Sequence, residues 1–240
     1  MREAIFVAGL TKKYGEKSIV NHLNLSVKSG TVFGLLGANG AGKSTMIECI
    51  LGTKKADGGI VQLFGQDPKK QRRSLFECIG VQFQESDYQK EIKVFELCKE
   101  VASLYRRPAD WRTLCEQFGI GDKTRVAVKS LSSGERQRLF IVLTLIPQPE
   151  IVFLDELTTG IDAKARRSVW KTLESLKKQG LTIFLASHFM DEVEALCDEI
   201  CILKNGTAVF YGTVEQAKER CGCEHFEDAY LELSDEEVGV

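Results

Sequence analysis

The sequence predicts an α/β protein whose central sheet is mostly parallel. The runs 151–156 (IVFLDE) and 181–188 (LTIFLASH) are almost entirely apolar until their polar ends, and the run 199–212 (EICILKNGTAVFYG) begins in the same way. Continuous apolar strands are typical of a sheet that is buried on both faces. Because helical stretches separate these runs, parallel pairing is favoured. Asn205 and Gly206 in the last run predict a two-residue hairpin turn.

The N-terminal part of the chain supplies further strands and one helix. Residues 4–10 (AIFVAGL) and 24–37 (NLSVKSGTVFGLLG) have the apolar, β-branched character of strands. Residues 44–52 (STMIECILG) predict a helix that ends at Gly52, because glycine suits a helix C-terminus. Residues 57–67 (DGGIVQLFGQD) predict a hairpin or an edge strand.

The middle of the chain is predicted to be a helical insertion. Residues 91–106 (EIKVFELCKEVASLYR) and 109–120 (ADWRTLCEQFGI) have helical patterns. The stretch from about residue 85 to 130 has no strand comparable to those above. Residues 134–146 (GERQRLFIVLTLI) predict a strongly apolar helix, which Pro147 stops.

Composition narrows the class of protein. The chain has 240 residues, 43% of them hydrophobic, and a formal net charge of -2. This balance does not favour nucleic-acid binding, which normally requires a basic surface. The longest apolar run, residues 139–146, is too short to span a membrane. The N-terminus lacks the pattern of a signal peptide, so we expect a cytoplasmic protein, with any membrane-spanning part on another chain.

The cysteines do not form an obvious framework. Eight are present, and none is arranged in paired C-x-x-C clusters. Cys221 and Cys223, with His225 nearby, are a candidate metal site, but a zinc site needs four converging ligands. Reduced cytosolic thiols are the preferred interpretation.

Residues 37–45 (GANGAGKST) form a candidate phosphate-binding loop between a predicted strand and a predicted helix. The pattern G-x-x-x-x-G-K-[ST] is met by Gly37, Gly42, Lys43 and Ser44. In such a loop glycines let backbone N–H groups surround phosphates, the lysine reaches the β- and γ-phosphates, and the hydroxyl is a ligand of Mg²⁺. The alternative is a structural glycine turn, and the class of nucleotide stays open. The residues expected to contact the nucleotide are Gly37, Ala38, Asn39, Gly40, Ala41, Gly42, Lys43, Ser44 and Thr45.

Two carboxylates end the apolar strand 151–156. Ligands of parallel sheets bind at the carboxyl ends of strands, which is where Asp155 and Glu156 lie. Asp155 is therefore placed to hold Mg²⁺, and Glu156 to polarise an attacking water as a general base. Without the phosphate-binding loop, two solvated acids at a strand exit would be the better interpretation.

The stretch 131–139 (LSSGERQRL) narrows the family. It resembles the signature motif of ATP-binding cassette (ABC) ATPases, usually L-S-G-G-Q or L-S-G-G-E. Such a motif can bind an anion, because Ser132 and the Gly134 backbone lie at the N-terminus of a helix whose dipole favours phosphate. Taken alone, the motif is equally compatible with a helix N-cap. In the family, this site, including Glu135, serves the ATP bound by the opposite subunit.

The resemblance assigns roles to four further residues, in the order of the family's motifs. Tyr14 matches the aromatic residue that stacks on adenine, and Gln84 matches the glutamine that contacts Mg²⁺ and relays the nucleotide state to a membrane partner. Asp162 matches the loop that crosses the dimer interface, and His188 matches the histidine that contacts the γ-phosphate. Taken singly, each has a plainer interpretation, such as a packed histidine or a polar strand end. The resemblance implies catalytic roles for Lys43, Glu156 and His188, and metal-binding roles for Ser44, Gln84 and Asp155.

The resemblance also implies a fold and a domain organisation. We expect a P-loop NTPase (RecA-like) core with a mostly parallel sheet, an N-terminal antiparallel β subdomain and an inserted α-helical subdomain. An ABC ATPase domain would span residues 1–222, with the core at about 1–84 and 139–222 and the helical subdomain at about 85–138. Residues 223–240 would be a short acidic C-terminal extension.

Two residues depart from the family pattern. Ser133 replaces the usual glycine of the signature and places a Cβ close to the phosphate bound by the partner. Leu157 replaces the usual proline after the glutamate, so the turn leaving the strand is expected to be less rigid. Neither change removes a charged or metal-binding group, and we predict an active ATPase.

The expected role is to supply a transporter with energy. The stretch between Gln84 and the signature is too short for the long coiled coil of DNA-repair members, and the chain holds one cassette rather than two. The sequences of residues 14–45 and of the segment FEDAYLELSD resemble those of bacterial drug-resistance (ABC-2-type) exporters. The cofactors would be ATP and Mg²⁺, and the partners a polytopic permease and a second copy of the chain, on the inner face of the membrane. The alternatives are the ATPase of an importer and a non-transport ABC ATPase.

Overall fold

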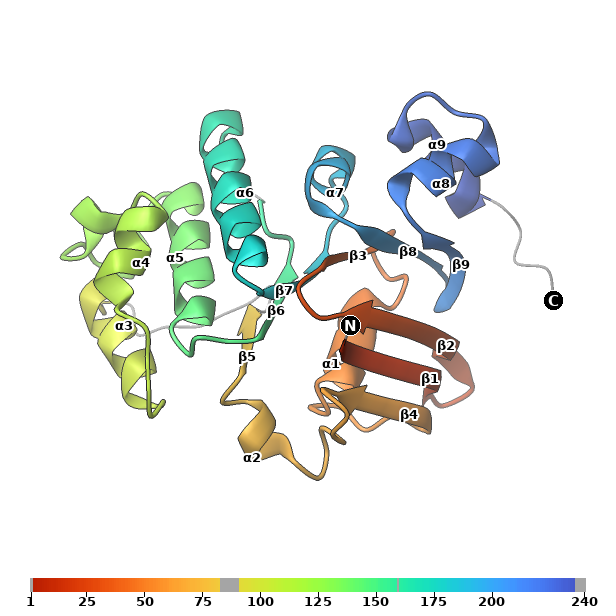
Figure 1. Cartoon of the computed structure of the whole chain (residues 1–240), viewed down its shortest axis with the longest axis horizontal. Helices are drawn as coiled ribbons and strands as arrows, with labels where there is room; N and C mark the ends of the chain where they lie inside the picture. Colours follow the sequence, from red (N-terminus) through yellow and green to blue (C-terminus); the bar gives the residue numbers. More distant parts are fainter. Residues whose placement is uncertain (1, 83–90, 159, 236–240) are drawn as a thin grey trace.

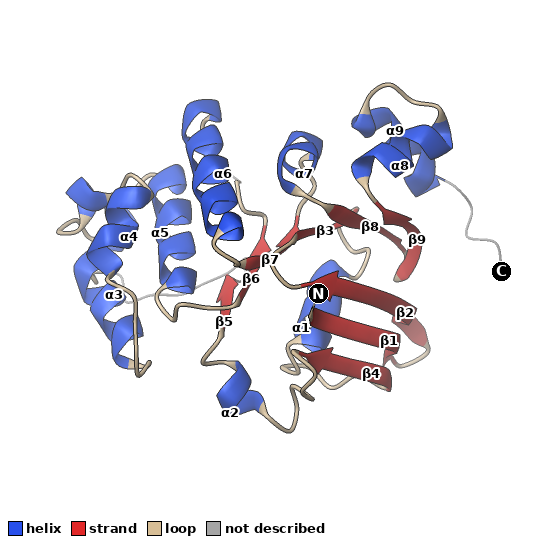
Figure 2. Cartoon of the chain, in the orientation of Figure 1, coloured by secondary structure: helices blue, strands red, loops and turns tan. Residues whose placement is uncertain are grey.

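The described part of the chain forms two sheets with helices around them (Figure 1). This computed structural model describes residues 2–82, 91–158 and 160–235. Figure 2 shows the strands gathered in the middle and lower right of the view, with most helices above and to the left. Among the helices described, none has both the length and the apolar character that a membrane crossing requires.

The six-stranded sheet confirms the predicted mostly parallel core. Its order is β5-β6-β7-β3-β8-β9, and only the last pair is antiparallel. Every residue of β3 and β7 is buried, as their unbroken apolar sequences predict. The strands are β3 (Val32–Gly37), β5 (Ile79–Gln82), β6 (Ile151–Asp155), β7 (Thr182–Ala186), β8 (Glu199–Lys204) and β9 (Thr207–Gly212).

A three-stranded antiparallel sheet is built largely from the N-terminal residues, in the order β2-β1-β4. Its strands are β1 (Glu3–Tyr14), β2 (Lys17–Lys28) and β4 (Gly58–Leu63). The last of these lies at the edge, which confirms the edge strand predicted at residues 57–67. Helix α1 (Lys43–Ile50) shares one apolar core with both sheets, so the phosphate-binding loop before it is held between them.

The helices of the middle segment form a group beside β5 and β6 (Figure 1). They are α3 (Val94–Ser103), α4 (Trp111–Gln117), two 3₁₀ turns (Gly121–Lys123 and Val128–Ser130) and α5 (Ser133–Leu145), with the short α2 (Arg72–Leu75) preceding β5. Helix α6 (Ala163–Lys178) follows β6, and α7 (Met190–Leu196) follows β7. A second apolar core joins the helix group to α6 and to the central sheet.

The C-terminal region continues the sheet and covers its far end. Asn205 and Gly206 both have positive φ angles, 49° and 78°, which is the geometry of the predicted hairpin turn between β8 and β9. Helices α8 (Val214–Cys221) and α9 (Phe226–Asp235) follow. Phe226 and Leu233 are fully buried in a third core with residues of β8 and α7. The described part of the acidic extension thus includes a packed helix.

Candidate active site

The loop between β3 and α1 follows a path that only glycine permits at two positions. A Cβ on Gly37 would lie 2.6 Å from the Leu203 carbonyl oxygen, and a Cβ on Gly42 would lie 2.5 Å from the Ile19 carbonyl oxygen. Both residues also have φ angles in the left-handed region, at 155° and 106°. The loop therefore lies tightly against β2 and β8 and delivers the N-terminus of α1 to the site, which is the arrangement that binds phosphate.

Lys43, the first residue of α1, turns back over this loop. Its ammonium donates hydrogen bonds to the carbonyl oxygens of Gly37 at 2.6 Å and Ala38 at 3.2 Å. Burial lowers the pKa of Lys43, and the nearby Asp155 and Glu156 carboxylates oppose this effect. The amine is thus held at the mouth of the loop, with acidic groups beside it.

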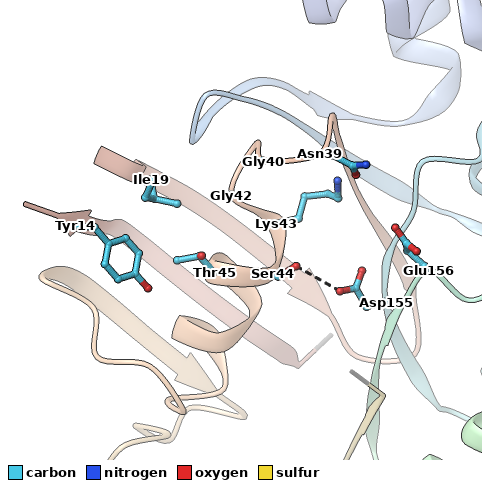
Figure 3. Close-up of a pocket in the computed structure, with 10 residues that line it drawn as sticks. All are labelled: Tyr14, Ile19, Asn39, Gly40, Gly42, Lys43, Ser44, Thr45, Asp155 and Glu156. Carbon is cyan, nitrogen blue, oxygen red and sulfur yellow. Dashed lines mark hydrogen bonds between the residues drawn. The ribbon is translucent and has the colours of Figure 1, made fainter. Parts of the chain in front are cut away.

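The loop forms one wall of a pocket of about 390 Å³, a volume in the range of ligand sites (Figure 3). Tyr14 lies at one end of the pocket and the two carboxylates lie at the other. Ile19, which the sequence analysis did not single out, also lines it. The lining residues are Tyr14, Ile19, Asn39, Gly40, Gly42, Lys43, Ser44, Thr45, Asp155 and Glu156.

Asp155 ends β6 and faces Ser44 across the pocket. The Ser44 hydroxyl lies 3.5 Å from an Asp155 carboxylate oxygen, drawn as a dashed line in Figure 3. Burial raises the pKa of Asp155, and the neighbouring Glu156 adds to this effect. A bound cation would offset both effects, because it favours the charged form of the Asp155 carboxylate. A hydroxyl and a carboxylate are hard oxygen ligands, so these residues fit Mg²⁺, whereas no cluster of three or more His, Cys, Asp or Glu suited to a metal occurs in the described ranges.

Glu156 has a strained backbone that its neighbours hold in place. Its φ angle is 54°, a left-handed value that is uncommon outside glycine. Its N–H donates to the Ala186 carbonyl oxygen at 2.9 Å, and its own carbonyl accepts from the Gln137 side chain at 3.0 Å. These two bonds fix the direction in which the Glu156 carboxylate leaves the strand.

His188 approaches Glu156 from the neighbouring strand. It follows the end of β7, and its Nδ1 lies 3.5 Å from a Glu156 carboxylate oxygen. The His188 ring packs against Phe189, with centroids 4.2 Å apart. The structure thus brings together the two residues that the sequence suggested as general base and γ-phosphate contact.

The signature residues lie outside this pocket. Ser132 is the N-cap of α5: its hydroxyl accepts from the Glu135 N–H at 3.2 Å, and its N–H donates to the Glu135 carboxylate at 2.9 Å. This reciprocal pair is a capping box. The N-cap interpretation is therefore correct for these side chains, and Gly134 lies in the first turn of the helix.

The Ser133 side chain makes a contact within its own chain that the sequence did not predict. Its hydroxyl donates a hydrogen bond to the Gly160 carbonyl oxygen at 3.1 Å, in the loop that leads from Glu156 to α6. Leu157 in the same loop is fully buried in the second core. Although proline is absent there, apolar packing anchors the turn, and the Ser133 side chain is directed to its own chain's loop.

The remaining predicted residues are placed as follows. Tyr14 is half-exposed, and the ammonium groups of Lys12 and Lys54 lie 5.2 and 5.6 Å from its ring centroid. Asp162 is the N-cap of α6, and two backbone N–H groups hold its pKa below the usual range, that of Ala165 contributing most. Gln84 lies outside the described residues.

Gln137 is a residue that sequence reasoning missed. It lies on α5, five residues after the N-cap Ser132, and it contacts the Glu156 backbone through the bond described above. Its spacing of four residues from Ser133 is a detectable signal, because residues at i and i+4 lie on the same face of a helix. The sequence did not, however, show which loop would pack there.

Comparison with known proteins identifies the class. A family model of ABC transporters matches residues 20–159. Nod factor export ATP-binding protein I of Ralstonia nicotianae is 38% identical over 212 residues, which cover 86% of this chain and 66% of that protein. Daunorubicin resistance ATP-binding protein DrrA3 of Streptomyces coeruleorubidus is 34% identical, covering 91% of this chain and 71% of that protein. The chain thus spans about two thirds of the first relative's length.

Solved structures share the fold. An ATP-binding subunit of an ABC transporter superposes with a TM-score of 0.88 at 22% identity, covering 97% of this chain and 100% of that one. The ADP conformation of MJ1267, an ATP-binding cassette, gives a TM-score of 0.79 at 23% identity, covering 99% and 100%. The chain therefore shares the fold of these ATP-binding cassettes.

The chain belongs to the ATP-binding cassette transporter family, as the signature resemblance predicts. Among its relatives are export and drug-resistance ATP-binding proteins, which confirms the resemblance to the drug-resistance exporter subfamily.

The bond from Ser133 to Gly160 leads to a stability prediction. Ser133→Ala keeps the Cβ but removes the donor, so we expect the free energy of unfolding to fall by about 0.5–1.5 kcal/mol, the net value of a typical hydrogen bond. Ser133→Gly should lose at least as much, because glycine is also a poor helix residue. Chemical denaturation of the two variants and the wild type measures the change in the free energy of unfolding. If both unfold at the wild-type denaturant concentration, the bond contributes nothing to stability.

Proposed function

We propose that this protein is the ATP-hydrolysing subunit of an exporter, acting with a separate membrane permease. The observation that carries the proposal is the meeting of Lys43, Asp155 and Glu156 in one pocket at the carboxyl ends of β3 and β6. His188, which follows β7, lies beside Glu156. A phosphate-binding loop, a metal-binding carboxylate and a candidate base are the parts that nucleotide hydrolysis requires.

In the proposed reaction Glu156 is the general base. Its carboxylate accepts a proton from the attacking water, while His188 contacts the γ-phosphate and keeps the water in line. Lys43 lies where charge develops on the phosphate oxygens, and its position at the loop mouth is maintained by two backbone carbonyls. Ser44 and Asp155 would hold Mg²⁺, as would Gln84 by the family resemblance, and the ion neutralises phosphate charge when bound. Tyr14 would stack on the adenine.

The proposed working unit is a head-to-tail dimer. Ser132, Gly134, Glu135 and Asp162 are absent from the pocket lining, although the family pattern assigns them to ATP binding. Two copies arranged head to tail would bring these groups of one chain to the phosphates held by the other. Each ATP would then be enclosed by two chains, and hydrolysis would depend on both.

A groove beside the helix group is the proposed permease contact. Residues of β5, α3 and α5 line a groove of about 250 Å³, and Leu104 at its rim is 74% exposed. Its lining is mainly apolar, with Val101, Phe140 and Leu143 among its residues. A short amphipathic helix on the cytoplasmic side of the permease is the partner that such a groove fits. The protein would therefore be peripheral on the inner face of the membrane.

Export is favoured over import by the relatives. The names of the Ralstonia and Streptomyces proteins describe export of Nod factor and resistance to daunorubicin. A structural neighbour at 24% identity, cbiO1, is described as part of the cbiONQ transporter complex, and it supports the fold alone. The substrate would be selected by the permease, so this chain does not identify it.

The assignment of the base is tested by Glu156→Gln. We expect ATP turnover to fall by about 10²–10⁴-fold, because the amide cannot accept the proton, while ATP binding persists. ATP should then trap a dimer, which size-exclusion chromatography detects. Glu174→Gln on the exposed face of α6 is the control. An enzyme that keeps most of its activity after Glu156→Gln would have a different base.

The permease contact is tested by Leu104→Glu. A charge in place of the exposed Leu104 side chain, which docking would bury, should weaken association with membranes on the order of tenfold, without changing the ATPase activity of the isolated chain. Membrane and soluble fractions of cells producing the chain together with its permease are compared. Leu231→Glu on α9, where the leucine is 53% exposed, is the matched control. Equal sedimentation of both variants with membranes would contradict the docking site.

A further inference from the structure

A fully buried carboxyl group lies behind the candidate catalytic residues. Glu192 on α7 is 0% exposed, and within the described ranges it is the only Asp, Glu, Lys or Arg in the buried class. It does not line the pocket and takes no part in the reaction proposed above. Because burying a carboxyl group is costly unless it is well hydrogen-bonded, its contacts are informative.

Glu192 lies against three segments of the chain. The Ser187 hydroxyl donates to one carboxyl oxygen at 2.6 Å, and the Trp170 indole N–H on α6 donates to the other at 3.4 Å. The hydroxyl of the buried Thr158 lies beside the same carboxyl. Its geometry does not satisfy a hydrogen bond to any group in the described part of the chain. Burial raises the pKa of Glu192, and these three groups oppose that effect.

These contacts reach both members of the catalytic pair. Ser187 immediately precedes His188, and its hydroxyl also accepts the Phe189 N–H at 3.1 Å, which fixes the turn on both sides of the histidine. Thr158 is two residues after Glu156, in the loop that continues to α6. Helices α6 and α7 lie side by side, α6 above β6 and β7 and α7 above β3 (Figure 1).

We propose that Glu192 is a positioning residue that sets the distance between Glu156 and His188 by joining the loops that carry them. The inference rests on the proposed ATPase activity. The carboxyl does not line the pocket. It acts through Ser187 on one side and through Trp170, with Thr158 beside it, on the other. The 3.5 Å approach of the His188 ring to the Glu156 carboxylate depends on this link.

The test separates positioning from simple packing by measuring kcat and KM for ATP in the full chain. Glu192→Ala should lower kcat by on the order of 10- to 100-fold, the effect of displacing reacting groups by about an ångström. KM, and the dissociation constant of a fluorescent ATP analogue, should stay within about twofold, because the phosphate-binding loop is untouched.

Two further variants keep the test independent of folding. Glu192→Gln retains an oxygen that accepts from Ser187 and should recover most of the activity lost in Glu192→Ala. Ser187→Ala should lower kcat like Glu192→Ala, and the double variant should be no slower than the slower single one, because both break the same link. Glu194→Ala, exposed on the same helix, is the matched control and should behave as wild type.

The outcomes are distinct. Wild-type kcat in Glu192→Ala, with only a lowered unfolding temperature, would show that the carboxyl serves packing alone and would overturn the inference. A loss confined to nucleotide affinity, or additive effects of the two single variants, would also overturn it. Absence of ATP hydrolysis by the wild-type chain would instead contradict the proposed function itself and remove the basis of this inference.

Discussion

The site depends on the parallel pairing of β6 with β7. Asp155 pairs with Ala186 in register, and the ladder continues one residue further, where the Glu156 N–H donates to the Ala186 carbonyl. Because both strands pack in apolar cores on both faces of the sheet, a shift in register would disrupt that packing and is strongly disfavoured. The same pairing that buries the strands therefore brings Glu156 and His188 to the same edge of the sheet, where each chain turns away.

The loop after Glu156 is held from several sides. Helix α5 contacts it through Gln137 and Ser133, the core contacts it through Leu157, and Glu192 lies beside Thr158. The strained backbone conformation of Glu156 is tolerated because these contacts hold the loop in place. If a partner's phosphate displaced the N-terminus of α5, the hydrogen bonds of Ser133 and Gln137 to this loop would transmit the displacement to Glu156.

Much of the fold and of the pocket was predictable from sequence, since glycine spacing and apolar runs are local signals. The predicted loop at residues 37–45 and the strand ending at Asp155 lie where expected. The contacts of Gln137, Ser133 and Glu192 were not predictable, because each joins residues at least five positions apart through a geometry that only packing fixes. Leu157 illustrates the same limit: its substitution for proline predicted a looser turn, but burial, which sequence alone did not reveal, anchors it.

The central claim is that one chain provides only half of a working ATP site. The signature residues lie outside the pocket that holds Lys43 and Glu156, so turnover should require two chains. The most direct measurement is ATPase activity per chain across a range of protein concentrations, with the oligomeric state followed by sedimentation in ATP and Mg²⁺. Activity per chain should rise with concentration in parallel with the fraction of dimer and then level off. A constant, high activity per chain at concentrations where the protein is monomeric would contradict the account.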